Sequence, residues 1–331
     1  MAKTCTELGG LKEYFAGLPN SMLLLSLAML RESIASSDIE NVNTTVEQAL
    51  QQQLFPETEQ RPADKEVLRY GQAMRWGFEQ LPNLSLSSRL IMGIQQQLLP
   101  GGYAGYQQTP NQIVNLATKQ PVYTPPPAHE ISRLLGNWEN FVHTTDERID
   151  PLIACSIMHY QFEAIHPFGD ENGRTGRILN VLYLVREGLL DIPVLYLNSH
   201  IVRTKADYYR LLQTVREQDC WEEWVLYVLQ AVEQTATQTI ATIHAIKAAL
   251  FDYKLRIRNG YRFYSQDLIN NLFTHPYTKI EFVQRDLSVS RLTATKYLDA
   301  LTAAGFLRKQ KIGRGNYYIN LALNAVLQPR P

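Results

Sequence analysis

The chain has 331 residues, of which 45% are hydrophobic and 19% charged, values typical of a folded protein with room for roughly two domains. Lys and Arg together number 32, as do Asp and Glu, which excludes an overall attraction to nucleic acid or to an anionic membrane. The charge is nevertheless divided. Residues 255–331 contain twelve Lys and Arg against four Asp and Glu, a net charge of +8, which leaves −8 on residues 1–254 and suggests two bodies with different partners.

The cysteine pattern and the N-terminal region favour a cytoplasmic protein. Cys5, Cys155 and Cys220 are widely spaced and form no CxxC pair, which argues against a disulfide framework or a zinc ribbon. The most apolar N-terminal run, Met22 to Leu30, is too short to span a bilayer and is followed at once by two charged residues. No basic segment with a small-residue cleavage site precedes it, so we expect no signal peptide and no membrane span.

Helical spacing of apolar residues predicts a mostly helical chain with one irregular interruption. Between residues 101 and 127, Gly, Gln, Thr and Tyr surround short apolar pairs and three prolines end the segment, so we expect a short hairpin there. Asn259-Gly260 is a stop signal for the last long helix. The expected helices cover residues 20–53 (resuming at Thr45), 64–82, 85–99, 128–142, 150–164, 174–188, 205–216 and 220–250.

The basic C-terminal part, residues 264–320, is expected to form three helices followed by a hairpin of two strands, with Gly305 ending the third helix. This order resembles a winged helix-turn-helix, with Ser290–Ala304 as the recognition helix. Two alternatives stay open, a solvated basic face and a protein-docking module. The side chains expected to meet phosphates or bases are Arg291, Thr293, Lys296, Lys309, Lys311 and Arg314.

The most informative segment is the window from His166 to Arg177, which reads HPFGDENGRTGR between two strongly apolar helices. Its glycines and Asn172 fall where a chain turns tightly and presents backbone N–H groups at a helix start, an arrangement that favours an anion. Arg174 and Arg177 are three residues apart and therefore project from one face of the first turn. Two guanidinium groups beside such a nest fit a polyphosphate better than a single carboxylate.

Two further side chains of this window have their own chemistry. Asp170 is a hard oxygen ligand of the kind that holds Mg²⁺ on phosphates, and the neutral imidazole of His166 could accept a proton from a hydroxyl nucleophile. The residues alone therefore indicate a Mg-nucleotide site with a general base. Two alternatives fit less well. Ordinary turn residues beside a solvated arginine pair would not bring so many functional groups together in one loop. A zinc site at His159 and His166 has no third ligand at a usual spacing.

The same window resembles the signature of Fic-domain proteins, HPFx(D/E)GNGRxxR. The likeness continues through Ile178–Asn180, Leu189–Leu197 and Asp207–Tyr209 and covers most of residues 20–230. It implies a mainly α fold, a Fic-type helical core with a short β-hairpin flap, here joined to the C-terminal winged helix-turn-helix domain. Eight pattern residues are present: His166, Pro167, Phe168, Asp170, Asn172, Gly173, Arg174 and Arg177.

The resemblance implies protein adenylylation (AMPylation), the transfer of AMP from ATP to a Ser, Thr or Tyr hydroxyl of a target protein, which includes the chain itself. In that scheme His166 deprotonates the hydroxyl, Asp170 holds Mg²⁺ on the phosphates, and Phe168 anchors the loop. The residues implied in nucleotide binding are Glu171, Asn172, Gly173, Arg174, Thr175, Gly176 and Arg177.

Glu171 departs from the family pattern, which most often has Gly at this position. If the turn requires a positive φ there, Glu is strained, and its carboxylate adds negative charge near the phosphates. The alternatives are that Glu171 faces solvent or assists the metal. The departure bears on the activity level and on the nucleotide preference.

The segment from Ser36 to Asn41 resembles the family's inhibitory pattern (S/T)xxxE(G/N), with Ser36, Glu40 and Asn41 in the defining places. A carboxylate that reaches Arg177 would occupy the fork needed by the γ-phosphate. We therefore predict autoinhibition by Glu40, so that its replacement by Gly raises AMP transfer.

Two other segments take their interpretation from the resemblance. Gln107–Val122 corresponds in position to the family's flap, a hairpin that aligns the target by strand addition, although a plain surface hairpin fits these residues as well. Ser199–Lys205 falls where the family contacts the adenine side, which makes Arg203 and Thr204 weak candidates, since Asn is common at the position of Thr204.

The sequence thus predicts an N-terminal helical region at 1–115 with an inhibitory helix near 30–41, a Fic catalytic core at 116–235, a linker helix at 236–260 and a winged helix at 261–331. The expected function is an autoinhibited protein adenylyltransferase that uses ATP with Mg²⁺ and modifies a target protein. DNA or protein docking through 261–331 and self-association are compatible with it. The alternatives are a nucleotide-sensing DNA-binding regulator with weak or no transfer, and a deAMPylase.

Overall fold

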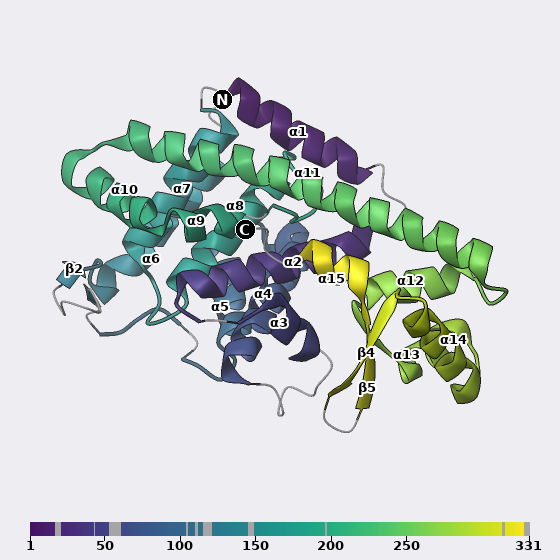
Figure 1. The fold of residues 1–331 in the computed structure, drawn as a ribbon. Coiled ribbons are helices and arrows are strands. Elements are labelled where there is room, and N and C mark those ends of the chain that lie inside the picture. The colour runs from purple at the N-terminus through teal and green to yellow at the C-terminus, as the bar shows by residue number, and fades with distance from the viewer. Residues whose placement is uncertain are drawn as a thin grey trace. The chain divides into compact units, whose positions relative to one another are not determined.

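The protein is described by a computed structural model (Figure 1) in which two compact units are distinguished. Unit 1 comprises Met1–Pro19, Ala28–Thr44 and Arg61–Thr239, and unit 2 comprises Asn20–Leu27, Thr45–Gln60 and Ile240–Pro331. Among the described residues, no helix combines the length and the apolar character needed to cross a membrane. The structure describes residues 1–16, 21–42, 44–52, 61–103, 105–109, 112–114, 121–144, 149–195, 197–312 and 315–327.

The regular elements in the described part of unit 1 are helices and one two-stranded antiparallel hairpin, in which Ile113 lies opposite Tyr123. Helices α2 (Ser21–Ile39) and α11 (Trp221–Gly260) each contribute residues to both units. The other elements of unit 1 are α1 (Ala2–Ala16), α4 (Pro62–Leu84), α5 (Ser88–Leu98), β1 (Ile113–Val114), β2 (Pro121–Tyr123), α6 (Ala128–His143), α7 (Pro151–Ile165), α8 (Asn172–Arg186), α9 (Leu197–Arg203) and α10 (Lys205–Gln218).

Helix α8 forms the centre of unit 1, where it packs against α4, α5 and α7. Its residues are buried on every side from Arg174 to Leu184, as expected of a helix without a polar face. Helix α7 is fixed in turn by two indole N–H groups, since Trp138 donates to the carbonyl of Met158 at 3.0 Å and Trp224 donates to that of Ser156 at 2.8 Å. The loop that joins α7 to α8 therefore starts and ends in the core.

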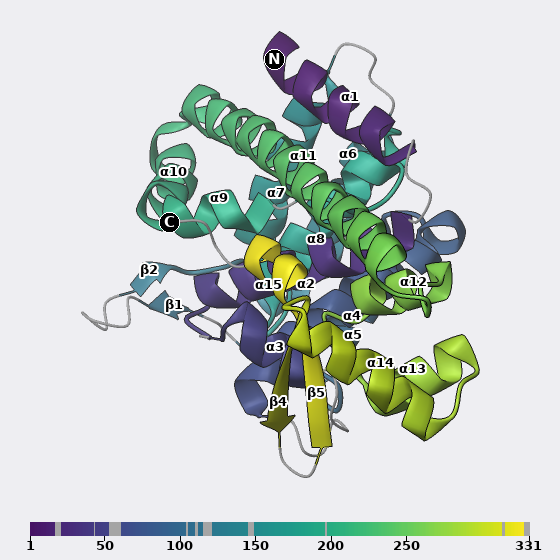
Figure 2. The ribbon, with the colours of Figure 1, turned by 45° about the vertical axis from the view of Figure 1, so that its right-hand side comes forward.

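Unit 2 contains a three-stranded antiparallel sheet in the order β3-β5-β4, with the two longer strands β4 and β5 side by side in Figure 2. The Ser290 hydroxyl caps the helix that begins at Arg291 by accepting the N–H of Thr293 at 3.2 Å. The elements of this unit are α3 (Val46–Gln52), α12 (Gln266–Thr274), β3 (Tyr277–Lys279), α13 (Ile280–Leu287), α14 (Arg291–Ala303), β4 (Leu307–Ile312), β5 (Gly315–Asn320) and α15 (Leu321–Leu327).

The predicted mainly helical fold with a hairpin between residues 101 and 127 is confirmed. The expected helical stretch 20–53 is two helices, because the chain turns after Ile39 and Asn41 adopts φ 62°. Elements α1, α9, β3 and α15 were not predicted; β3 and α9 are too short to show a period. The hairpin turn at 313–314, which includes Arg314, and parts of the Gln107–Val122 segment lie outside the described residues.

Candidate active site

The loop from His166 to Glu171 is closed on the first turn of α8 by the side chain of Asn172. Its Oδ1 accepts the N–H of Phe168 at 2.9 Å, and its Nδ2 donates to the carbonyl of Phe168 at 2.7 Å. The Phe168 ring is fully buried, as the sequence led us to expect. These contacts hold the loop at the N-terminus of α8, where the helix dipole favours an anion.

The first and last residues of this loop have left-handed backbone conformations. His166 ends α7 with φ 49°, and Glu171 precedes α8 with φ 69°. This conformation costs a non-glycine residue roughly 1–2 kcal/mol and is concentrated at functional sites. Glu171 thus occupies the positive-φ position at which the family pattern most often has Gly.

The Glu171 side chain does not face solvent but pairs with Arg174. Its two carboxylate oxygens lie 2.9 and 3.1 Å from Arg174 Nη1, and Glu66 of α4 lies 2.7 Å from Arg174 Nη2. Burial raises the pKa of Glu171 to about 7, helped by the nearby carboxylates and opposed by Arg174. Arg174 therefore lies between two acidic groups.

Arg177, one helical turn further along α8, is held by the end of α2. Its Nη2 lies 2.7 Å from Glu40 Oε1, and the Ser36 hydroxyl accepts from both Nε and Nη2 at 3.2 Å. Burial by itself raises the pKa of Glu40, but the guanidinium of Arg177 pulls it below its ordinary value. The carboxylate is therefore ionised and pairs with Arg177 through Nη2.

The turn after α2 explains the third residue of the Ser36–Asn41 pattern. Asn41 adopts φ 62°, a conformation that Gly and Asn tolerate better than other residues. Its side-chain oxygen accepts from Lys205 Nζ at 3.0 Å. This turn places Glu40 beyond the last residue of the helix, directed at Arg177.

Gly173 lies directly against the ends of the Arg177 and Glu40 side chains, so a larger residue would push these two groups aside. A Cβ there would lie 2.8 Å from both Arg177 Nη1 and Glu40 Oε1. Gly176 is equally constrained, since a Cβ would lie 2.7 Å from the buried Oε1 of Glu163. Burial raises the pKa of Glu163 to about 7, so a second carboxyl group lies near Arg177 without being fully ionised.

The imidazole of His166 is suited to accept a proton. Burial lowers its pKa, against the opposing effects of its hydrogen bond to the Glu163 backbone and of the Glu40 and Asp170 carboxylates. His166 is therefore neutral at physiological pH. A neutral imidazole is the form that acts as a general base.

A cleft of about 370 Å³ opens over this loop. It brings the proposed base, the proposed metal ligand and Arg174 to one cavity. The exposed backbone at Gly169, where a Cβ would meet nothing within 4 Å, leaves room for a ligand to approach the loop. The lining residues are Glu40, Val42, Glu66, His166, Gly169, Asp170, Glu171, Asn172, Gly173 and Arg174.

Asp170 suits a metal that is shared with phosphates. One of its oxygens, Oδ1, accepts the N–H of Glu171 at 2.8 Å, and the residue is exposed in the cleft. The described residues contain no group of three His, Cys, Asp or Glu side chains arranged around a common metal position. A single carboxylate fits Mg²⁺, which is usually held by one or two carboxylates together with substrate phosphates.

Three family models match the chain along most of its length. They are described as Fic/DOC family N-terminal (residues 1–79), Fic/DOC family (residues 85–184) and protein adenylyltransferase SoFic-like, C-terminal domain (residues 252–323). The chain belongs to the Fic/DOC family. The Fic/DOC match includes the whole His166–Arg177 loop and helix start.

Curated relatives resemble about a third of this Fic/DOC protein. "Probable protein adenylyltransferase aq_aa38" of Aquifex aeolicus is 34% identical over 107 residues, which are 32% of this chain and 32% of that protein. "Protein adenylyltransferase fic-1" of Caenorhabditis elegans is 35% identical over 95 residues, 29% of this chain and 17% of that protein. The matches thus span a third or less of these relatives.

Solved structures share the fold over greater lengths. A Fic family protein from Desulfovibrio desulfuricans G20 has a TM-score of 0.61 at 21% identity and covers 96% of this chain and 95% of that one. Fic-1 (residues 134–508) from C. elegans has a TM-score of 0.57 at 22% identity, with 73% and 72% covered. These likenesses establish a Fic fold.

The structure separates the predicted site residues of this Fic/DOC protein into three sets. His166, Asp170, Arg174 and Glu40 share the cleft with the α8 start. Thr175 and Gly176 are buried in α8. Arg203 and Thr204 line a different cavity, and Thr204 Oγ1 hydrogen-bonds the Tyr227 hydroxyl at 2.8 Å.

Three residues of the site were missed by sequence reasoning. Glu66 and Glu163 are ordinary acidic residues of helices, and only the packing of α4 and α7 around α8 brings them to the arginines. Gln107 was noted only as the first residue of the hairpin segment. Its backbone N–H donates to the carbonyl of Pro167 at 2.9 Å, so it touches the loop directly.

Proposed function

We propose that this Fic/DOC protein is a protein adenylyltransferase that transfers AMP from Mg-ATP to a hydroxyl group of a target protein and is inhibited by Glu40. The observation that carries the proposal is the single cleft that joins neutral His166, the exposed carboxylate of Asp170 and the anion-binding start of α8. The names of the curated relatives agree with this activity.

The chemistry assigned to these residues is an in-line displacement. The target hydroxyl gives its proton to His166, and its oxygen forms a bond to the α-phosphorus while the bond to the bridging oxygen breaks and pyrophosphate leaves. The N–H groups at the α8 start and Arg174 orient the phosphates and stabilise their charge. Asp170 would hold Mg²⁺, which neutralises phosphate charge when bound.

The inhibition is assigned to competition for Arg177. As long as Glu40 lies on the guanidinium, a γ-phosphate has to displace it to form the same charge-assisted bonds. The hydrogen bond that Arg177 Nε donates to the Ser36 hydroxyl and the turn at Asn41 support this role by fixing the end of α2.

The proposal is tested by label transfer from α-phosphate-labelled ATP with Mg²⁺ to an acceptor protein mixture and to the chain itself. Three proteins are compared: wild type, Glu40→Gly, and Glu40→Gly combined with His166→Ala. Labelling that rises with the first change and vanishes with the second is expected. ATP binding without labelling in any form would instead favour the nucleotide-sensing regulator, and release of AMP from a modified target would favour the deAMPylase.

We propose a docking role for the C-terminal part of unit 2 as a winged helix. Arg291 and Lys309 are paired with Glu281 and Asp299 at 2.9 and 2.8 Å, whereas Lys296 is exposed on α14. Exposed pairs of this kind are weak and are readily exchanged for phosphates. The cytoplasmic location stays a prediction from the sequence.

A further inference from the structure

A carboxylic acid is buried on the inner face of α2, and the proposed mechanism does not use it. Glu32 is only 3% exposed, and its two side-chain oxygens each accept the backbone N–H of Asn198 at 3.2 Å. Asn198 Nδ2 in turn donates to the backbone carbonyl of Glu32 at 3.4 Å. This pair of residues therefore fastens α2 to α9.

Glu32 lies on the same helix face as the residues that hold Arg177. Ser36 follows Glu32 by four residues, which places both side chains on one face of α2. Glu40 follows Ser36 by four more, at the turn that ends the helix. The fastening to α9 and the contact with Arg177 are thus made by one side of one helix.

The hydroxyl of Tyr70, a fully buried residue of α4, connects these two contacts. It accepts from Asn198 Nδ2 at 3.0 Å and is also hydrogen-bonded to the Ser36 hydroxyl. The Ser36 hydroxyl accepts in turn from Arg177 Nε at 3.2 Å. A continuous row of buried polar groups therefore leads from Glu32 to Arg177.

Glu32 has no cation of its own in this row. In the described part of the chain, the cation that acts on its charge is Arg177, whose guanidinium is already bonded to the end of α2. Asn198 is uncharged, and burial raises the pKa of Tyr70 above its ordinary value, so that its hydroxyl is neutral as well. Burial raises the pKa of Glu32 to about 8, against the opposing effects of the Asn198 N–H and of Arg177. The carboxyl group is therefore protonated at neutral pH and ionised in mildly alkaline solution.

The surroundings of Glu32 are poorly suited to hold a charge. Ser37 Oγ of α2 and Asn198 Oδ1 of α9 are buried with no hydrogen-bond partner among the described residues, and each such atom weakens the packing around it. Ionised Glu32 would add a buried charge without a partner of its own. That charge reaches water only if α2 moves away from α9.

We propose that Glu32 makes the inhibition by Glu40 sensitive to pH, because protonated Glu32 keeps α2 docked and loss of this proton releases the end of the helix from Arg177. The inference rests on the inhibition assigned in the proposed function and names the condition that relieves it. The docked helix binds the proton, whereas a released Glu32 has its ordinary pKa of 4.5 and is ionised at neutral pH. Raising the pH toward 8 therefore favours release by up to about tenfold per pH unit. Above pH 8 the effect levels off, because the docked state has lost the proton as well.

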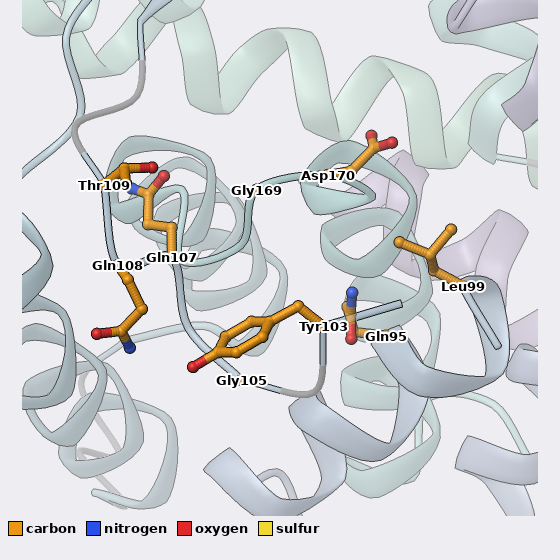
Figure 3. A pocket seen from close by; sticks show the side chains of 9 residues that line it. All are labelled: Gln95, Leu99, Tyr103, Gly105, Gln107, Gln108, Thr109, Gly169 and Asp170. Atoms are coloured by element: carbon orange, nitrogen blue, oxygen red, sulfur yellow. The ribbon is translucent and has the colours of Figure 1, made fainter. Parts of the chain in front are cut away.

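The test compares wild type with Glu40→Gly between pH 6.5 and pH 8.5, by the Kd for ATP and by the rate of AMP transfer. The ratio between the two proteins reports the inhibition, because other titrating groups are present in both. Among these groups are His166 and Asp170, the latter exposed where the nucleotide cleft meets a second groove of about 500 Å³ (Figure 3). We expect the ratio of the Kd of wild type to that of Glu40→Gly to fall about tenfold over this range.

The matched variants are Glu32→Gln and Asp38→Asn, each compared with the same variant carrying Glu40→Gly. The amide oxygen of Gln still accepts the Asn198 N–H but has no proton to lose, so the ratio should stay at its pH 6.5 value throughout. Asp38 is an exposed acidic residue of the same helix, and Asp38→Asn should reproduce the wild-type profile.

A second measurement needs no variant of Glu32. Calorimetric titration with ATP in two buffers of different ionisation enthalpy counts the protons released on binding. At pH 7.5 wild type should release about half a proton more than Glu40→Gly, because ATP displaces the end of α2 only in wild type.

Three results would overturn the inference: a ratio that is flat in wild type together with no excess of released protons, a pH dependence that persists in Glu32→Gln, and a pH dependence that Asp38→Asn abolishes. A ratio of one at every pH would refute the proposed inhibition and this inference together. Absence of AMP transfer in every protein, with the pH-dependent ratio of the Kd values retained, would refute the proposed transferase activity but support the role of Glu32.

Discussion

Replacement of Glu40 by glycine removes the carboxylate that lies 2.7 Å from Arg177 Nη2, and it should raise ATP affinity while lowering stability. Both effects have one cause. Arg177 gains a free fork for the γ-phosphate, but in the absence of nucleotide its buried charge loses the ionised partner.

The exposure of the two partners sets the magnitude. The Arg177 side chain is 2% exposed and that of Glu40 37%, so the pair is neither a surface pair, worth under about 1 kcal/mol, nor a fully buried one, which costs about 3–5 kcal/mol to break. We take about 1–2 kcal/mol for this pair. Since 1.4 kcal/mol corresponds to a factor of ten, the Kd for ATP should fall roughly 5- to 30-fold, and the Tm without nucleotide should fall by about 2–8 °C.

Isothermal titration with ATP and thermal unfolding measure the two quantities. Glu40→Gln should give intermediate values, because its amide oxygen still accepts a hydrogen bond from Arg177. Asp38→Ala removes an exposed acidic side chain of the same helix and should change neither quantity beyond about twofold in Kd or 2 °C. Unchanged or weaker ATP binding by a folded Glu40→Gly protein would refute the reasoning.

Three further outcomes are expected. Glu171→Gly relieves the backbone strain at φ 69° and frees Arg174 from one carboxylate, so ATP should bind several-fold more tightly with little change in Tm; weaker binding in titration would contradict this. The pKa of Glu163 is raised from 4.5 to about 7 in the folded protein, so the folded state binds this proton more tightly and the wild type loses stability as the pH rises between these values. In urea unfolding, the free energy of unfolding of Glu163→Gln should therefore rise by about 1–3 kcal/mol relative to that of wild type between pH 5 and pH 8. Parallel curves of unfolding free energy against pH would refute the assignment. Lys296→Ala should reduce the slope of log affinity for a 20-base-pair DNA duplex against log salt by about one, whereas salt-independent or undetectable binding of the wild type would exclude DNA docking by α14.

A site can be predicted from a single sequence where its functional residues are close together in the chain. The His166–Arg177 window contains the proposed base, the proposed metal ligand, backbone N–H groups and two arginines within one loop and one helical turn, so a Mg-nucleotide site could be predicted there from the residues, and their roles stay a prediction. The contact between Glu40 and Arg177 spans 137 residues and came from a family pattern, since no local rule links two such distant positions.

Other parts of the site depend on contacts between distant helices, which cannot be predicted from the local pattern of a single sequence. The sequence gives no sign that Glu66 is more than an ordinary acidic residue of a helix. It pairs with Arg174 only because α4 packs on α8. Thr175 and Gly176 belong to the motif yet face inward, because a helix without a polar side gives no sign of which residues border the cleft. The sequence shows that Glu171 departs from the family pattern. Its pairing with Arg174 follows from the left-handed backbone at Glu171, which only the structure shows.

The burial of α8 from Arg174 to Leu184 has a consequence for the proposed inhibition by Glu40. Because this part of α8 is packed on every side, the helix has no room to rotate or slide. Arg177 therefore keeps its position when the Glu40 contact breaks. The part of the Glu40–Arg177 contact that can move is then the end of α2. There Glu40 and Asn41 are exposed to solvent, and Lys205 holds the turn through its hydrogen bond to Asn41. An activator that binds at this surface turn could therefore relieve the proposed inhibition by drawing the Glu40 carboxylate away from Arg177 or by competing for Lys205.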